Sequence, residues 1–184
     1  MRKGLVTILA LASIGVGALA LRQDAPWILQ NVSPSSPLGF YLYRDRAPAI
    51  GDYLAFRPHG RGFERVTEAT GLPMPKVPML KRVIAGPGDQ VCYSREHDVF
   101  RVNDDPPLGI EERAFQGREI PIWQGCRALT QKEYFVHSDR IPNSLDSRFY
   151  GPVQASTIVG TYAPLWIEPV TRAGLAEPTA QGMI

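Results

Sequence analysis

The chain has 184 residues, a formal net charge of +2 and a hydrophobic fraction of 44%. This length suits one globular domain with a real core and an appendage, and the nearly balanced charge argues against a nucleic-acid partner. The 17 prolines and 17 glycines are scattered along the sequence, which favours short elements joined by turns over long helices.

The N-terminus carries two basic residues, Arg2 and Lys3, before an uncharged apolar run over residues 4–21. Such a run is just long enough to cross a bilayer as a helix, and the positive charges before it favour a cytoplasmic N-terminus. A cleaved signal peptide is the alternative, because small residues stand near the end of the run. The length of the run and the poor cleavage site at Leu21 and Arg22 favour an uncleaved transmembrane anchor.

Three parts follow from this pattern. Residues 1–22 are predicted to form the cytoplasmic tip and the anchor, and residues 23–169 to form one exported domain. Residues 170–184 are small and polar, which predicts a flexible C-terminal tail.

The exported domain is predicted to be mostly β, with strands that curl round a core as a barrel or a folded antiparallel sheet. Segments rich in β-branched and aromatic residues and bounded by turn residues predict its strands. They span residues 40–44, 52–57, 79–85, 89–94, 98–103, 133–138 and 156–167. One short helix is predicted over residues 62–71, because its final glycine suits a C-cap.

The chain has two cysteines, Cys92 and Cys126, and neither stands at a metal-ligand spacing. In an oxidising compartment such a pair is most simply one disulfide, here closing a loop of about 34 residues. The alternative is two buried free thiols. The sequence implies no metal site.

The first candidate site is the segment NVSPSSPLGFY, residues 31–41. Serine, proline, glycine and asparagine are the residues of turns, so the segment alone predicts only a loop. A serine becomes a nucleophile when a base takes its proton, and a lysine amine is one such base.

The strand predicted over residues 79–85 carries Lys81 and Arg82, which must point to opposite faces. If Arg82 faces water, Lys81 shares the apolar face of Val83, and desolvation lowers its pKa toward neutrality. A neutral lysine can act as a general base, whereas an edge-strand lysine would simply extend into solvent. A serine–histidine pair has weaker support from the three histidines, which are His59, His97 and His137.

The third candidate segment is HSDRIPNSLDSRFYG, residues 137–151. It could be a charged surface loop held by aspartate–arginine pairs. It could equally support a site, with Asp146 and Arg148 paired and Ser144 hydrogen-bonded to a nearby amine.

Taken together and in order, the blocks VSPSSP, IGDYLAFR, LKRVIAGPGD and NSLDSRFYG resemble the signal peptidase I superfamily of membrane-anchored Ser–Lys proteases. The segment NVSPSSPLGFY, the insert ERVTEATGLP and the block WQGCRAL are similar to its TraF-type conjugal-transfer branch. The resemblance runs from the anchor to about Ala163. In one departure, SDRIPNS has one residue more than the usual S-D-x-P-x-S, which leaves Asp139 and Arg140 without an assigned role.

The resemblance implies that Ser35 is the nucleophile, since it stands two residues before Pro37, and that Lys81 is the general base. That spacing selects Ser35 over its neighbour Ser36. The other implied roles are an oxyanion-hole hydroxyl at Ser33, orientation of the lysine amine by Ser144, and a supporting ion pair between Asp146 and Arg148.

The resemblance further implies a serine endopeptidase in the bacterial inner membrane, with its catalytic domain in the periplasm and no cofactor. Its expected substrate is a pilin precursor or another exported peptide, cleaved and in some relatives cyclised, and its expected partners are conjugative type IV secretion components. Two alternatives stay open. One is a general signal peptidase for exported preproteins, and the other is a catalytically inactive module of a conjugation or secretion apparatus.

Overall fold

The computed structural model describes residues 25–110, 114–138, 140–141 and 144–169. The predicted anchor, the predicted C-terminal tail and Asp139 lie outside these residues. Within the described residues, no helix has the length and apolar character needed to cross a membrane.

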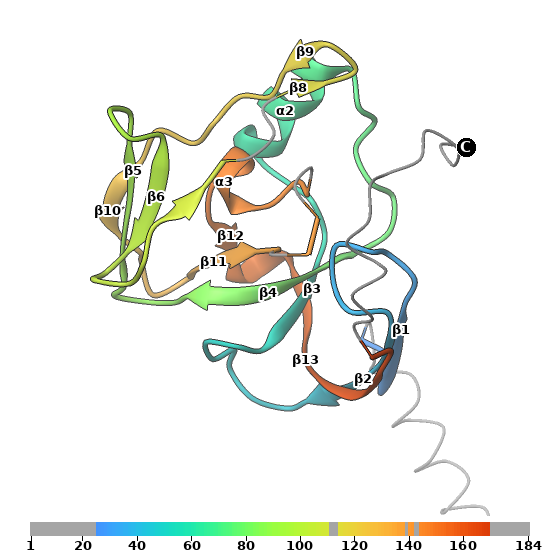
Figure 1. The fold of residues 1–184 in the computed structure, drawn as a ribbon. Helices are drawn as coiled ribbons and strands as arrows, with labels where there is room; N and C mark the ends of the chain where they lie inside the picture. Colours follow the sequence, from blue (N-terminus) through green and yellow to red (C-terminus); the bar gives the residue numbers. More distant parts are fainter. Residues whose placement is uncertain (1–24, 111–113, 139, 142–143, 170–184) are drawn as a thin grey trace, which may run out of the picture.

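A seven-stranded sheet forms the centre of the molecule (Figure 1), in the order β1-β2-β13-β3-β4-β11-β12. All of its strand pairs are antiparallel. The strands are β1 (Ile28–Asn31), β2 (Gly39–Arg44), β3 (Tyr53–Phe56), β4 (Met79–Ala85), β11 (Glu133–His137), β12 (Val153–Gln154) and β13 (Ile158–Ile167). Since β1 and β12 end the order, the described sheet is open rather than a closed barrel.

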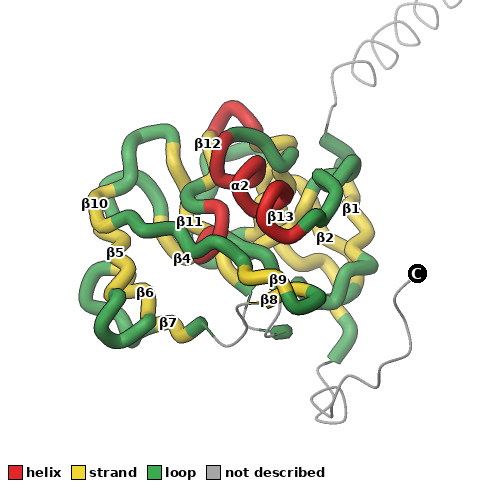
Figure 2. Tube along the Cα trace, turned by 90° about the horizontal axis from the view of Figure 1, so that it is seen from above, coloured by secondary structure: helices red, strands yellow, loops and turns green. Residues whose placement is uncertain are grey.

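A second antiparallel sheet lies at the opposite end of the molecule from β1 and β2 (Figures 1 and 2). Its order is β10-β5-β6-β7. The strands are β5 (Gln90–Ser94), β6 (Val99–Val102), β7 (Leu108–Gly109) and β10 (Cys126–Ala128). Cys126 stands directly opposite Cys92, and a disulfide joins the two residues, which is the pairing that the sequence suggests.

A two-stranded hairpin and two helices complete the described structure, together with a short 3₁₀ turn over Ala155–Thr157. The hairpin consists of β8 (Ala114–Phe115) and β9 (Arg118–Glu119), and the helices are α2 (Arg61–Thr70) and α3 (Ser147–Tyr150). Helix α2 ends at Gly71, whose φ of 73° is the left-handed conformation that glycine adopts at a C-cap.

The main core lies between the sheet and the two helices. Its largest cluster joins the inward-facing side chains of β3, β4 and β11 to the apolar faces of α2 and α3. The cluster includes Leu54, Phe56, Phe63, Val66, Val83, Val136 and Phe149. Lys81 belongs to the same face of β4 as Val83, so a basic side chain enters an otherwise apolar core.

The prediction of a mostly β domain is confirmed, and each of the seven predicted strands matches an observed strand closely. The predicted helix is shifted by one residue at each end. The last predicted strand begins later, at Ile158, because a 3₁₀ turn occupies Ala155–Thr157. The sequence analysis missed β1 and α3, each of four residues, and the shorter strands β7, β8, β9, β10 and β12.

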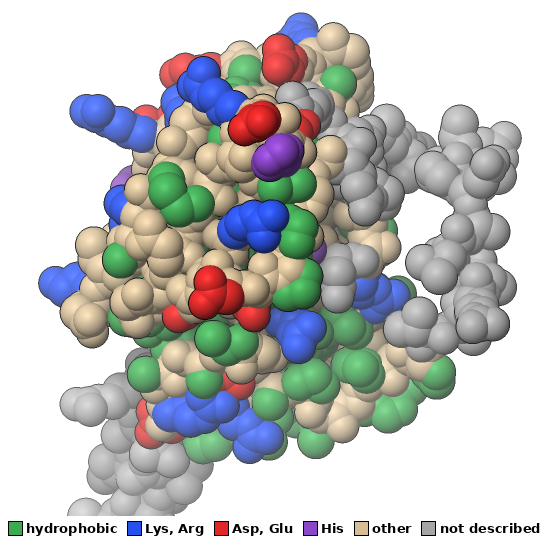
Figure 3. Space-filling view, turned by 60° about the vertical axis from the view of Figure 1, so that its left-hand side comes forward, with side chains coloured by type: hydrophobic (Ala, Val, Ile, Leu, Met, Phe, Trp, Pro, Cys, Tyr) green, Lys and Arg blue, Asp and Glu red, His purple; other side chains and the backbone are tan. Residues whose placement is uncertain are grey.

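Charged side chains of both signs are interspersed over the face viewed from the side of the second sheet, and hydrophobic side chains gather along its lower part (Figure 3). Exposed hydrophobic residues also occur on neighbouring strands of the main sheet. They are Trp27 and Ile28 at β1, Phe40 on β2, and Leu165, Trp166 and Ile167 on β13.

Candidate active site

The serine-rich loop between β1 and β2 is held by the side chain of Asn31, at the end of β1. Its amide nitrogen donates to the carbonyl oxygens of Ser33 at 2.9 Å, of Ser36 at 3.0 Å and of Pro37 at 3.0 Å. Its amide oxygen accepts from the Ser33 N–H at 3.1 Å. One buried asparagine therefore fixes a loop that has few regular backbone hydrogen bonds, and the sequence analysis assigned it no role.

The serines of this loop are held in different ways. Ser36 is 2% exposed, and its hydroxyl donates to the Leu80 carbonyl on β4 at 2.8 Å. Ser35 is half-buried, and its hydroxyl shares a hydrogen bond of 3.1 Å with the exposed Ser33. The hydroxyl of Ser138, just after β11, donates to the Ser35 carbonyl. Ser36 thus anchors the loop, while the Ser35 hydroxyl contacts only another hydroxyl among the contacts described.

Lys81 is buried beside this loop. The side chain is 3% exposed, while that of Arg82 is exposed, as strand alternation predicts. Its ammonium donates to the Ser144 hydroxyl at 2.8 Å. Burial lowers the pKa of Lys81 to about 8; the nearby Asp146 carboxylate opposes this shift and the Arg148 guanidinium adds to it.

Asp146 and Arg148 form a buried ion pair behind the lysine. Asp146 is fully buried and Arg148 is 4% exposed, and the guanidinium binds both carboxylate oxygens at 2.9 Å. Asp146 also accepts from the backbone N–H groups of Ser138 and Arg148, both at 3.1 Å. Arg148 reaches the Gly109 carbonyl at 2.8 Å. The segment is therefore a buried support rather than a charged surface loop.

The support and the serine loop are connected through Ser138. Its N–H binds Asp146, and its hydroxyl binds the carbonyl of Ser35. The N–H of Arg140 approaches the same hydroxyl at 3.5 Å. Ser138 is thus a positioning residue that the sequence did not reveal, because its contacts join segments about a hundred residues apart.

Two cavities meet at Ser35 and Lys81, which line both of them. The larger, of about 550 Å³, runs along β1 and the proline-rich segment before β4. The smaller, of about 250 Å³, lies between Ser144 and the β8–β9 hairpin. Ser33 lines the larger cavity and Ser144 the smaller, so the two hydroxyls flank the serine–lysine pair.

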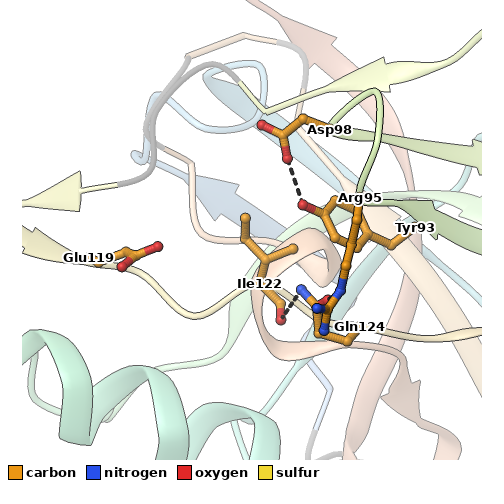
Figure 4. Close-up of a pocket in the computed structure, with 6 residues that line it drawn as sticks. All are labelled: Tyr93, Arg95, Asp98, Glu119, Ile122 and Gln124. Atoms are coloured by element: carbon orange, nitrogen blue, oxygen red, sulfur yellow. Dashed lines mark hydrogen bonds between the residues drawn. The ribbon is translucent and has the colours of Figure 1, made fainter.

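A third pocket, of about 520 Å³, shares no lining residue with these two cavities (Figure 4). Two pairs of its polar groups already bind each other. The Tyr93 hydroxyl donates to Asp98 at 2.6 Å, and Arg95 donates to Gln124 at 2.7 Å. Across the described residues, no cluster of histidine, cysteine or acidic side chains could hold a metal ion.

The sequence matches a known family of peptidases. The family model described as signal peptidase, peptidase S26, matches residues 2–166. The chain belongs to the S26 signal peptidase family. It is therefore a serine-type peptidase by family.

Similar proteins include conjugal-transfer proteins of the TraF type. A probable conjugal transfer protein TraF from Sinorhizobium fredii is 31% identical over 89% of this chain and 94% of its own length. A plasmid transfer protein TraF from Escherichia coli is 31% identical over 83% of this chain and 92% of its own length. A crystal structure of a signal peptidase I from Enterococcus faecalis is 20% identical, with a TM-score of 0.35, and the match covers 62% of this chain and 96% of that one. The chain is an S26 peptidase of the TraF type.

Proposed function

We propose that this chain is a membrane-anchored endopeptidase that matures an exported peptide, such as a conjugative pilin subunit, through an acyl-enzyme on Ser35 with Lys81 as the general base. The observation that carries the proposal is the shared position of the two side chains. Ser35 and Lys81 line the same two cavities, and the Lys81 amine is buried and oriented by Ser144 at 2.8 Å.

The chemistry is an acyl transfer. Neutral Lys81 takes the hydroxyl proton of Ser35 as the oxygen attacks the scissile carbonyl carbon. The tetrahedral intermediate expels the leaving amine, which receives the proton from Lys81. Water, or the amine at a chain end, then attacks the carbonyl carbon of the acyl-enzyme. Lys81 takes the proton of this nucleophile and gives it to the Ser35 oxygen as the ester bond breaks. With water the product is a cleaved peptide, and with the substrate's own N-terminus it is a cyclic peptide.

The charge that develops on the carbonyl oxygen needs hydrogen-bond donors. The Ser33 hydroxyl lies 3.1 Å from the Ser35 hydroxyl, close enough to donate to that oxygen once Ser35 has attacked. Removing one donor of this kind typically costs about 3–4 kcal/mol of transition-state stabilisation.

The larger cavity suits an extended peptide. It runs along Leu29, Gln30 and Asn31 of β1, and β1 is an edge strand that pairs only with β2 in the described sheet. An exposed edge can accept a further strand through backbone hydrogen bonds. We propose that the substrate binds there, which brings its chain past Ser35.

The exported location is part of the proposal. The apolar run at residues 4–21 would tether the domain beside the membrane, where the end of a membrane-inserted precursor emerges. The similarity to conjugal-transfer proteins supports a pilin substrate over a general preprotein.

The test is the intact mass of a pilin-like precursor co-expressed with the wild-type chain or with Lys81→Met, which keeps an apolar stem of similar length. In both cases the precursor loses a terminal peptide only when Lys81 is present. A product that weighs one water less than the linear cleaved peptide indicates cyclisation, and a product with the mass of the linear peptide indicates hydrolysis. Broad cleavage of unrelated preproteins would favour a general signal peptidase. If the wild-type chain leaves the precursor unprocessed and a serine-reactive acylating probe does not label it, the proposal that the chain is an active peptidase is wrong.

The pH dependence gives a further prediction. Because only the neutral amine accepts a proton and the pKa of Lys81 is lowered to about 8, kcat/KM should rise about tenfold per pH unit below that value and level off above it. The measurement is kcat/KM for a substrate whose acylation limits the rate. A flat profile between about pH 6 and about pH 9 would exclude Lys81 as the base.

A further inference from the structure

Asn31, the last residue of β1, determines the shape of the serine loop. It is 7% exposed, and its side-chain amide reaches across the loop to the carbonyl of Pro37, six residues later. Between residues 32 and 38, all of them described, the loop has one backbone hydrogen bond of its own. It runs from the Ser36 N–H to the Ser33 carbonyl and is long, at 3.4 Å. The conformation of the loop therefore depends on side chains, and above all on Asn31.

The two peptide planes that flank Ser33 are both bound by this side chain. The amide oxygen of Asn31 accepts from the Ser33 N–H at 3.1 Å, as in an Asx turn, and the amide nitrogen donates to the Ser33 carbonyl at 2.9 Å. Because the N–H belongs to the plane before the Cα atom and the carbonyl to the plane after it, these bonds restrict both backbone dihedrals of Ser33. Pro34 adds to the restriction, since the residue before a proline disfavours the helical region.

The Ser33 hydroxyl has no comparable anchor of its own. Ser33 is exposed, and the one hydrogen bond described for its hydroxyl is that with the Ser35 hydroxyl at 3.1 Å. Once the backbone of Ser33 is fixed, only its χ1 angle remains, and this angle chooses among the three staggered rotamers. The position of the hydroxyl is therefore set by the backbone that Asn31 holds.

The amide of Asn31 has no free donor for a substrate. An asparagine side chain has two N–H donors, and the nitrogen here lies within 3.0 Å of three carbonyl oxygens, those of Ser33, Ser36 and Pro37. Both donors are thus committed to the loop. Although Asn31 lines the larger cavity, it cannot donate to a developing oxyanion without releasing the loop, so its effect on the reaction passes through the groups that it holds.

We propose that Asn31 is the positioning residue of the oxyanion hole: by binding both backbone groups of Ser33, it holds the Ser33 hydroxyl where it can donate to the oxygen of the attacked carbonyl. The proposal rests on the proposed function and adds a residue that acts on the transition state through Ser33. A donor is effective only if it already points to the place where the negative charge forms, and a displacement of about 1 Å can lower a rate by about 10²-fold.

Tyr41 holds the same loop at another point and provides the matched control. It is fully buried on β2, the strand that pairs with β1 (Figure 1), and its hydroxyl donates to the Pro37 carbonyl at 2.6 Å. It makes no described hydrogen bond to Ser33. Tyr41→Phe therefore weakens the loop on the other side of Ser35 and leaves the backbone of Ser33 bound to Asn31.

The experiment measures hydrolysis of the p-nitrophenyl ester of N-acetyl-alanine by the full chain in detergent. The Ser35→Ala rate is subtracted, and active sites are counted by titration with a serine-reactive acylating probe, which removes the contribution of unfolded chains. Ser33→Ala should lower kcat by about 10²-fold or more, and Asn31→Ala by about 10²-fold. KM should change little in both variants, because the lost hydrogen bond forms only in the transition state.

The double variant, Asn31→Ala with Ser33→Ala, shows whether the effect passes through Ser33. Once the Ser33 hydroxyl is gone, the loss of Asn31 should cost no more than about threefold, because groups that act as a unit are not additive. Tyr41→Phe should instead lower kcat by the same factor with and without that hydroxyl. Asn31→Ser, which retains one donor and one acceptor, gives a milder form of the same comparison if thermal unfolding shows that Asn31→Ala does not fold.

The outcomes separate the two proposals. If the factors for the Asn31 and Ser33 variants multiply, or if Ser33→Ala leaves kcat unchanged, the assignment of Asn31 to the oxyanion hole is wrong and the peptidase stands. Hydrolysis that is no slower in Ser35→Ala than in the wild-type chain would overturn the proposed function, and the positioning role with it.

Discussion

Ser35→Ala should abolish covalent labelling by a serine-reactive acylating probe and lower peptide processing by at least about 10⁴-fold, because no other group takes over when a nucleophile is removed. The fold should be unaffected, since the Ser35 hydroxyl binds only that of Ser33 among its described contacts. Labelling detected by intact mass and thermal unfolding of the same sample would check both statements.

Ser36→Ala is the matched control, one residue away in the same loop. Its hydroxyl is committed to the Leu80 carbonyl, so its loss should cost about 1 kcal/mol of stability and leave labelling in place. A result in which Ser36→Ala loses labelling and Ser35→Ala keeps it would exchange the roles of the two serines.

The local pattern of the sequence was enough to predict the longer strands and the residues that those strands place in the site. The alternation of faces along β4 determines that Lys81 enters the core when Arg82 faces water, and the buried amine is found there. The other six predicted strands were likewise long enough to leave a recognisable pattern in the sequence. Helix α2 was recognisable from the glycine at its C-cap.

The parts that the sequence did not predict are those held in place by contacts with residues far away in the chain. Helix α3 has four residues, too few for a periodic pattern, and it begins where Asp146 caps it. Asn31 and Ser138 stand within the quoted motifs, but they act through hydrogen bonds to backbone groups, which the sequence does not show. The β8–β9 hairpin likewise shows only a glutamine–glycine turn in the sequence, and the hydrogen bond from Arg118 to the Thr70 carbonyl joins it to α2.

The ion pair behind Lys81 has two effects on the site. It fixes Ser138 and the start of α3 through hydrogen bonds from the backbone to the Asp146 carboxylate. It also places opposite charges near the lysine, whose effects on the Lys81 pKa have opposite signs. Because these two effects oppose each other, burial remains the main cause of the lowered Lys81 pKa, and the amine can be neutral at a mildly alkaline pH.

Arg148→Ala should therefore destabilise the domain by about 3–5 kcal/mol, because it leaves the fully buried Asp146 carboxylate without its partner. Urea unfolding followed by tryptophan fluorescence measures this loss. The pH profile of the remaining activity should move to higher pH, since the cation that lowers the Lys81 pKa is gone while the carboxylate that raises it stays.

Arg127→Ala provides the matched control, because Arg127 also pairs with a carboxylate, that of Glu133 at 2.6 Å, but its side chain is 44% exposed against 5% for Arg148. Glu133 is itself buried, but it keeps hydrogen bonds from the Thr130 N–H and the Gln154 amide, and water can replace the exposed guanidinium. The loss of Arg127 should therefore cost only about 1 kcal/mol and leave the pH profile unchanged. Equal losses of stability in the two variants would mean that burial does not distinguish the two pairs. An unchanged pH profile in Arg148→Ala would mean that Lys81 does not sense the pair, in which case the support acts on Ser138 and the serine loop alone.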